Sequence, residues 1–320
     1  MSCVVAVIPS YQRLPELFRL LLSLENQTRR PDLVVVVDNA ADIEVERSLE
    51  HGAWRGQSEY PITTSERVRH APCHMQVSYL PLLGNPGCGA ALLAGMKKAG
   101  ELTENRVTHF LNLDDDVILD PETTQRLLHG IEISGCMAMV PQIIDAQGRL
   151  ESGPQPVSGA DIRLRKLVNR PLEWIRKAKK PFVKVRWFRG PCYMVSTHSV
   201  ETVGYPRDDF WMLGEDIEYS LRLSNSGDCF VDLNAVVRHC PPFVSDLEAT
   251  EKSHRMKFGA MLQNLFYMAA HLAHCRGVWR YIPGHCLRYL RTFPSCIENV
   301  AALALFCWRG VFLGLPAGKK

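Results

Sequence analysis

Short apolar runs alternate with segments of helical hydrophobic spacing along the first part of the chain. Residues 3–11 form an apolar, β-branched run, and residues 13–28 place leucines at the spacing of one helix face. Residues 33–40 are again apolar until they end in polar side chains. Because buried-type strands joined by a helix are typical of βαβ units, this order predicts an α/β fold with a mostly parallel sheet flanked by helices.

The alternation continues to about residue 145. Further strands are predicted over residues 76–83, 108–116 and 138–145, and helices over residues 90–100 and 121–133. In a sheet of this kind, ligands bind where loops leave the carboxyl ends of the strands.

The second half of the chain is less regular. An apolar run covers residues 191–204, a helix is predicted around residues 217–223, and residues 229–243 indicate a strand or hairpin. From residue 251 onward the pattern is helical and rich in Leu, Tyr and Arg.

The apolar tail, residues 299–320, is interrupted by Arg309 and Gly310, so it does not predict a transmembrane helix. Trp308 and Phe312 stand beside Arg309, a combination that suits the surface of an anionic membrane. Packing of the same helix on the protein's own body explains the pattern equally well.

Composition and charge limit the classes of molecule that the protein is expected to bind. A formal net charge of +3 over 320 residues gives no indication of nucleic-acid binding, although residues 163–189 are dense in Lys and Arg. That stretch is either a solvated helix or a surface for a phosphorylated acceptor or anionic lipid. Eleven scattered cysteines without a CxxC pair, and an N-terminus unlike a signal peptide, predict a cytoplasmic protein.

Three consecutive carboxylates, Asp114, Asp115 and Asp116, follow a predicted buried strand. Like charges this close disfavour one another's ionised forms, so a cation is expected nearby. Asp114 and Asp116, two apart in an extended segment, face one side and suit Mg²⁺ or Mn²⁺, while Asp115 points elsewhere. The alternative is a solvated acidic turn in which Asp120 caps the following helix.

Other polar signals fall at the same edge of the predicted sheet. Asp38 and Asn39 end the second strand, and a turn with Gly84, Gly87 and Gly89 precedes a helix, where backbone amides suit a diphosphate. The turn is not a GxGxxG fingerprint, so no hydride-transfer cofactor is indicated.

Together these motifs resemble the family 2 glycosyltransferases with the GT-A fold. The segments that carry the resemblance are PSYQR (9–13), VVDN (36–39), GNPGCGAA (84–91), LDDDV (113–117), GEDIEYSLRL (214–223) and RH (238–239). The aspartate triplet and the acidic GEDIEY segment are most similar to those of bacterial galactofuranosyltransferases and rhamnosyltransferases.

The resemblance implies a Rossmann-like GT-A domain over residues 1–245, with a nucleotide-binding half (1–120) and an acceptor-binding half (121–245). The resemblance ends there, and the helical pattern predicts that residues 246–320 form a C-terminal extension that either rests on a membrane or packs on the protein's own body. The residues implied in nucleotide-sugar binding are Pro9, Tyr11, Arg13, Asp38, Asn39, Asn85, Gly87 and Asp115. For the metal, the resemblance adds His239 to Asp114 and Asp116, and an imidazole shifts preference from Mg²⁺ toward Mn²⁺.

The acidic segment GEDIEYSLRL is the second candidate for chemistry. Displacement at an anomeric carbon needs a base for the acceptor hydroxyl, and the resemblance gives that role to Asp216. Glu215 would orient the acceptor, Trp211 would offer a flat platform to the sugar, and Glu218 would pair with Arg222. The alternative is an acidic helix start stabilised only by the helix dipole.

The implied activity is an inverting, metal-dependent transfer from a UDP- or dTDP-sugar to a glycan or polyprenyl-linked acceptor. Such a reaction belongs to cell-surface polysaccharide synthesis at the inner face of the membrane. A sugar nucleotidyltransferase is one alternative, although PSYQRLPELF is not its glycine-rich, basic phosphate loop. The other is a catalytically silent protein that binds nucleotide sugars.

Overall fold

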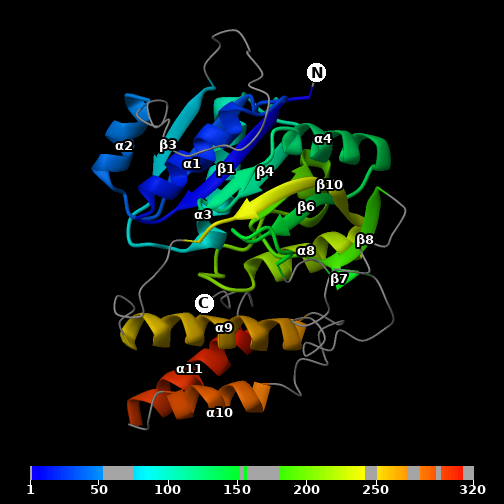
Figure 1. Cartoon of the computed structure of the whole chain (residues 1–320). Helices are drawn as coiled ribbons and strands as arrows, with labels where there is room; N and C mark the ends of the chain where they lie inside the picture. Colours follow the sequence, from blue (N-terminus) through cyan, green and yellow to red (C-terminus); the bar gives the residue numbers. More distant parts are fainter. Residues whose placement is uncertain are drawn as a thin grey trace.

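A single large sheet lies between two layers of helices, and three further helices lie below it (Figure 1). The computed structural model describes residues 2–52, 75–151, 155–156, 181–241, 251–271, 282–292 and 297–312. The α/β class, the mostly parallel central sheet and the C-terminal helical extension are confirmed. Residues 157–180, which hold most of the basic stretch, lie outside the described residues.

The predicted elements of the first 145 residues are present, with ends within about three residues of those expected. The described strands are β1 (Val4–Ser10), β2 (Leu33–Asp38), β3 (Val77–Pro81), β4 (His109–Leu113), β5 (Val117–Leu119), β6 (Ala138–Ile144), β7 (Gln155–Pro156), β8 (Phe182–Trp187), β9 (Cys192–Ser196) and β10 (Cys229–His239). The described helices are α1 (Leu14–Glu25), α2 (Ile43–Glu50), α3 (Cys88–Leu102), α4 (Thr123–Ser134), α7 (Thr197–Val203), α8 (Glu215–Ser226), α9 (Glu251–His271), α10 (Ile282–Thr292) and α11 (Ile297–Phe312). Helix α2 was not predicted.

The strand order brings several loop ends together at one edge. The sheet runs β3-β2-β1-β4-β9-β6-β10-β8-β7, and β5 pairs with β10. The first four strands are parallel, as are β6 and β10, whereas β9 runs antiparallel between β4 and β6. Ser10 pairs with Asp38, so the loops after β1 and β2 leave the sheet side by side, and the loop after β4 joins them.

Alternate residues of the buried strands point into two separate cores. In β1, Val4, Ala6 and Ile8 pack with helices α1, α2 and α4, and Val5 and Val7 pack with α3, α7 and α8. This alternation follows from the two-residue repeat of a strand. Both faces are covered, which explains why β1 and β2 are apolar up to their last residues, Ser10 and Asp38.

The C-terminal helices pack on the body of the protein. Leu265 and Met268 of α9 contact a cluster that includes Phe210 and Leu221, while Leu262, on the same helix, packs with α10 and α11. Within the described residues, no helix has a stretch that is long and apolar enough to cross a membrane. Helix α9 thus packs on the body of the protein, whereas α11 packs on α9 and keeps one face exposed.

Gly95 allows α3 to lie directly on the sheet. A Cβ atom at this position would be 2.4 Å from Val7 Cγ1 and 2.7 Å from Val37 Cγ2. We expect Gly95→Ala to destabilise the protein by about 1–3 kcal/mol, because the added methyl group overpacks a close helix–sheet contact. Gly284→Ala in α10, where a Cβ meets nothing within 4 Å, is the matched control and gains up to about 1 kcal/mol of helix propensity. Urea unfolding measures both, and equal stability of the two variants would contradict the packing argument.

Candidate active site

A cavity of about 1210 Å³ opens where the loops after β1, β2 and β4 leave the sheet. Its wall is completed by the N-termini of α3 and α8, the end of β10 and residues of α9 and α10. The structure brings nearly all sequence-predicted site residues to this wall. They are Pro9, Tyr11, Arg13, Asn39, Asn85, Gly87, Asp114, Asp115, Asp116, Trp211, Glu215, Asp216 and His239.

Two of the three consecutive aspartates have positive partners. Asp115 accepts hydrogen bonds from Ser10 Oγ (2.9 Å) and Arg13 Nη1 (3.1 Å), and the same guanidinium lies 2.7 Å from Asp116 Oδ2. Burial raises the pKa of Asp115 to about 6 in spite of Arg13. The pKa of Asp116 is lowered, because His239 and Arg13 together outweigh its burial.

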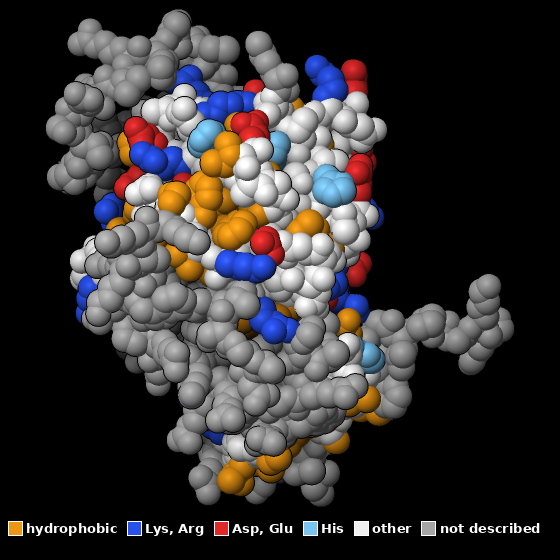
Figure 2. All heavy atoms as spheres, turned by 90° about the vertical axis from the view of Figure 1, so that its right-hand side faces the viewer, with side chains coloured by type: hydrophobic (Ala, Val, Ile, Leu, Met, Phe, Trp, Pro, Cys, Tyr) orange, Lys and Arg blue, Asp and Glu red, His pale blue; other side chains and the backbone are white. Residues whose placement is uncertain are grey.

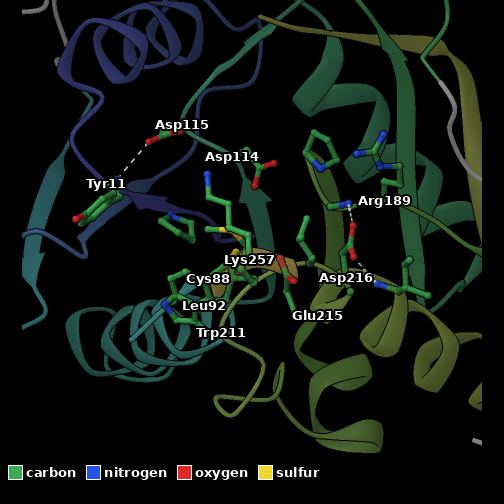
Figure 3. Close-up of a pocket in the computed structure, with 18 of the residues that line it drawn as sticks. Tyr11, Cys88, Leu92, Asp114, Asp115, Arg189, Trp211, Glu215, Asp216 and Lys257 are labelled. Carbon is green, nitrogen blue, oxygen red and sulfur yellow. Dashed lines mark hydrogen bonds between the residues drawn. The ribbon is translucent and has the colours of Figure 1, made fainter. Parts of the chain in front are cut away.

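Asp114 lacks such a partner. Among the described residues no ion pair reaches its carboxylate, and burial together with the charges of Asp116 and Asp115 raises its pKa to about 7. In Figure 3 the side chain of Asp115 points toward Tyr11, whereas that of Asp114 points into the cavity. Among the three aspartates, Asp114 is thus the one whose ionised form a bound cation would stabilise the most.

Asp114, Asp116 and His239 can offer one ligand atom each, all within 4.8 Å of one another. His239 Nε2 lies 3.3 Å from Asp116, and its Nδ1 lies 2.9 Å from Glu151 Oε1. An Nδ1–H that donates to Glu151 leaves Nε2 turned toward the aspartates, an arrangement typical of metal-binding histidines. Two carboxylates and an imidazole suit Mn²⁺ or Mg²⁺, so the residues present fit a divalent ion.

The environment of His239 favours the protonated, positively charged form of its imidazole. Burial lowers its pKa, but the hydrogen bonds to Asp116 and Glu151 more than offset this and raise it to about 10. Glu151 was not singled out from the sequence, because it lies 88 residues from His239 and outside every motif.

Asp38 differs from the other predicted nucleotide-binding residues, because it does not line the cavity. Its side chain accepts hydrogen bonds from the amides of Ala40 (2.9 Å) and Asp42 (2.7 Å) and from Tyr79 Oη (2.9 Å). In this structure the carboxylate builds the turn between β2 and α2. Its contact with a nucleobase stays a prediction. Asn39 does line the cavity, and its buried Oδ1 has no hydrogen-bond partner among the described residues.

The glycine turn has a packing role that the sequence did not indicate. Gly87 has φ +99°, and a Cβ there would lie 2.1 Å from the carbonyl oxygen of Trp211. The Trp211 carbonyl accepts a hydrogen bond from Cys88 N (2.9 Å), and Trp211 Nε1 donates to Asn85 O (3.0 Å). Through these two hydrogen bonds and the close approach at Gly87, the turn holds in place the loop that leads into α8.

Glu215 and Asp216 begin α8 inside the cavity (Figure 3). Asp216 Oδ2 accepts a hydrogen bond from Gly190 N (2.7 Å), while the buried Oε2 of Glu215 finds no hydrogen-bond partner in the part of the chain that the structure describes. Burial raises the pKa of both carboxyl groups, and the neighbouring charge of Asp216 raises that of Glu215 further. The predicted Glu218–Arg222 pair is present at 2.7 Å, on the same helix.

Helix α9 adds residues that the sequence analysis did not select. Lys257 lines the cavity, and Figure 3 shows its side chain extending toward the region between Tyr11 and Asp114. Met261 of the same helix also lines the wall. No motif pointed to them, because the helix meets the site only through tertiary packing.

Comparison with known proteins identifies the fold. No protein-family model and no curated protein matches the sequence. S. aureus TarS 1–349 with UDP-GlcNAc superposes with a TM-score of 0.55 at 13% identity, over 97% of this chain and 82% of that one. GalNAc-T7 with UDP, GalNAc and Mn²⁺ gives 0.53 at 13% identity, over 88% and 54%. Both are GT-A glycosyltransferases. This chain has the GT-A fold.

The likeness extends over nearly the whole chain but not over the whole of the longer neighbours. A longer TarS structure matches with a TM-score of 0.54 at 14% identity, and 96% of this chain covers 48% of it. The chain thus spans about half the length of that protein. At such identities the likeness shows the GT-A fold alone.

The glycine turn of this GT-A fold can be tested without a substrate. We expect Gly87→Ala to destabilise the protein by about 1–3 kcal/mol more than Gly84→Ala, because only the former drives a Cβ into the Trp211 carbonyl. Both positions have positive φ, at +99° and +80°, so Gly84→Ala controls for the positive φ alone. The ψ of 178° at Gly87 adds a backbone conformation that is essentially restricted to glycine and acts in the same direction as the close contact. Chemical unfolding of both variants is the measurement, and equal losses would mean that the loop moves aside freely.

Proposed function

We propose that this chain is an inverting, metal-dependent glycosyltransferase of family 2, which moves a sugar from a nucleotide-diphosphate donor to an acceptor hydroxyl. The observation that carries the proposal is the shared cavity. In it, a cluster suited to a divalent ion, formed by Asp114, Asp116 and His239, opens into the same space as the acids of α8. The GT-A fold and the sequence motifs support the assignment.

Asp114, Asp116 and His239 would hold Mn²⁺ or Mg²⁺, with the imidazole favouring Mn²⁺. When bound, the ion supplies charge neutralisation to the departing diphosphate. The chain's own part is to present two carboxylates and Nε2 on one side, with Glu151 behind the imidazole.

In this proposal the donor nucleotide binds against the end of β1 and the loop after β2. Within the described ranges Asn39 Oδ1 is a buried acceptor without a hydrogen-bond partner, and Tyr11, which lines the cavity, is 43% exposed. An unsatisfied buried acceptor is stabilised by a ligand N–H group, such as the N3–H of uracil or thymine. UDP is preferred to dTDP because neighbours of the same fold were solved with UDP and UDP-GlcNAc.

Asp216 takes the proton from the acceptor hydroxyl as the new bond forms. The hydrogen bond from Gly190 N holds one carboxylate oxygen in place, and burial raises the pKa of the group toward that of a working base. Glu215 orients the acceptor and Trp211 offers its ring as a platform. In-line attack from the acceptor side inverts the anomeric centre.

Two substitutions separate the proposed base from the proposed metal ligand. We expect Asp216→Asn to lower kcat by about 10²–10⁴-fold, because the base is lost, with little change in donor binding. Asp114→Asn should instead weaken metal-dependent donor binding. Asp208→Asn, at an exposed position in the preceding loop, is the matched control. The measurements are transfer kinetics and UDP-sugar binding with and without Mn²⁺.

The base assignment is wrong if Asp216→Asn turns over at the wild-type rate. The metal assignment is wrong if donor affinity and its dependence on Mn²⁺ are unchanged in Asp114→Asn. Absence of binding to every UDP- and dTDP-sugar tested would reject the proposed function as a whole.

The acceptor is proposed to be a glycan or polyprenyl-linked molecule that the enzyme meets at an anionic membrane on the cytoplasmic side. One face of α11 is apolar and exposed, with Ala301, Ala304, Leu305 and Trp308 at helical spacing and Arg309 beside them. Figure 2 shows hydrophobic side chains at the lower end of the molecule, where α10 and α11 lie. Apolar residues flanked by arginine are typical of helices that lie in an anionic lipid surface.

A vesicle experiment tests this contact. We expect Leu305→Glu to reduce co-sedimentation with phosphatidylglycerol vesicles several-fold at low salt, because it adds a charge to the apolar face. The control Ile133→Glu alters a more exposed apolar residue, on α4, which is 61% exposed against 44% for Leu305, and should leave binding unchanged. Wild-type protein that fails to sediment at low salt would remove the membrane from the proposal.

A further inference from the structure

Asn264 is a buried polar residue in the middle of α9, only 1% exposed. Its Nδ2 donates to two backbone carbonyls of the loop before α8, that of Met212 at 2.9 Å and that of Leu213 at 2.8 Å. Only the amino group of the amide can make these bonds, because carbonyl oxygens are acceptors, so the contacts fix the orientation of the side chain.

The backbone that Asn264 holds is strained. Leu213 has φ +63° and Gly214 has φ +109°. The left-handed region is unfavourable for a non-glycine residue such as Leu213 and persists only where the surroundings enforce it. Gly214 packs against α9, since a Cβ there would lie 3.7 Å from Asn264 Cβ and 3.6 Å from Met268 Cε.

This strained turn sets the direction in which the acids enter the cavity. Gly214 is the N-cap of α8, and Glu215 and Asp216 are its first two residues. On the other side the loop is fixed by the hydrogen bond from Cys88 N to the Trp211 carbonyl. Met212 and Leu213 lie between the Trp211 carbonyl and the N-cap of α8. In the described part of the chain, Asn264 is the side chain that donates hydrogen bonds to their carbonyls.

We propose that Asn264 is a positioning residue: by holding the Met212 and Leu213 carbonyls it orients Glu215 and Asp216 toward the acceptor. The inference rests on the proposed function only in that Asp216 acts as the base. It makes α9 a working part of the active site, as the same helix also brings Lys257 to the cavity wall.

The main test replaces the amide with a carboxylate of the same shape. In Asn264→Asp, a carboxylate oxygen replaces the amino group that donates both hydrogen bonds. It faces the Met212 and Leu213 carbonyl oxygens and repels them, so α9 no longer holds the turn before α8. We expect kcat to fall about 10–100-fold, the range that small misplacement of catalytic groups produces, while the dissociation constant for the UDP-sugar with Mn²⁺ stays within about twofold. Asn264→Ala removes the same donors without adding charge and should show the same split.

Gln263→Glu is the matched control, because it makes the same chemical change one residue earlier on α9, at a half-buried side chain that does not line the cavity. It should leave kcat and donor binding at wild-type values. If both Asn264 variants keep the wild-type kcat, the positioning role is wrong. If donor binding falls in parallel with kcat and with thermal stability, α9 only supports the fold, and the inference is again overturned.

A readout without chemistry separates this inference from the proposed function. Amide hydrogen exchange of residues 213–217 should accelerate at least about tenfold in Asn264→Ala relative to Gln263→Glu, because the loop opens locally more often. Unchanged exchange would refute the positioning role even if transfer were impaired. Accelerated exchange in a protein whose wild type transfers no sugar would instead refute the proposed function and leave the Asn264 contact standing.

Discussion

Repulsion among carboxylates crowded into one cavity is the constraint on which the site depends. Arg13, delivered by the loop after β1, lies against Asp115 and Asp116, while His239 at the end of β10 lies against Asp116 from the other side. Both cations reach the triplet only because their strands are held in register within one sheet. Asp114 makes no ion pair among the described residues, and the nearby charge of His239 offsets its burial only in part, which makes it the natural first ligand of an added ion.

Much of the fold could be predicted from the sequence, because buried strands and amphipathic helices have different hydrophobic periods. The strands that carry the site were found for that reason, and the aspartates were noticed because they interrupt an apolar run. Helix α2 was missed, since Val45 and Leu49 are its only buried residues and give a weak period. Glu151 and Asn264 carry no local signal, because their contacts form only when distant segments meet.

Asp38 and Gly87 show why a correct motif does not fix a role. An aspartate after a strand serves equally to close its own turn, and here three donors of the protein already occupy its carboxylate. A glycine before a helix favours a bound phosphate on general grounds, yet Gly87 is also required by the Trp211 carbonyl against its α-carbon. Sequence alone cannot separate these uses, because both demand the same residue at the same place.

The apolar contact between α9 and the body also bears on how the protein can be divided. Phe210 lies in the loop before α8 and Leu221 in α8 itself, yet Leu265 and Met268 of α9 complete the cluster that buries them. A recombinant fragment that stops at residue 245 would uncover this cluster and a share of the cavity wall. Such a fragment would tend to self-associate, so the smallest unit fit for expression extends through α9.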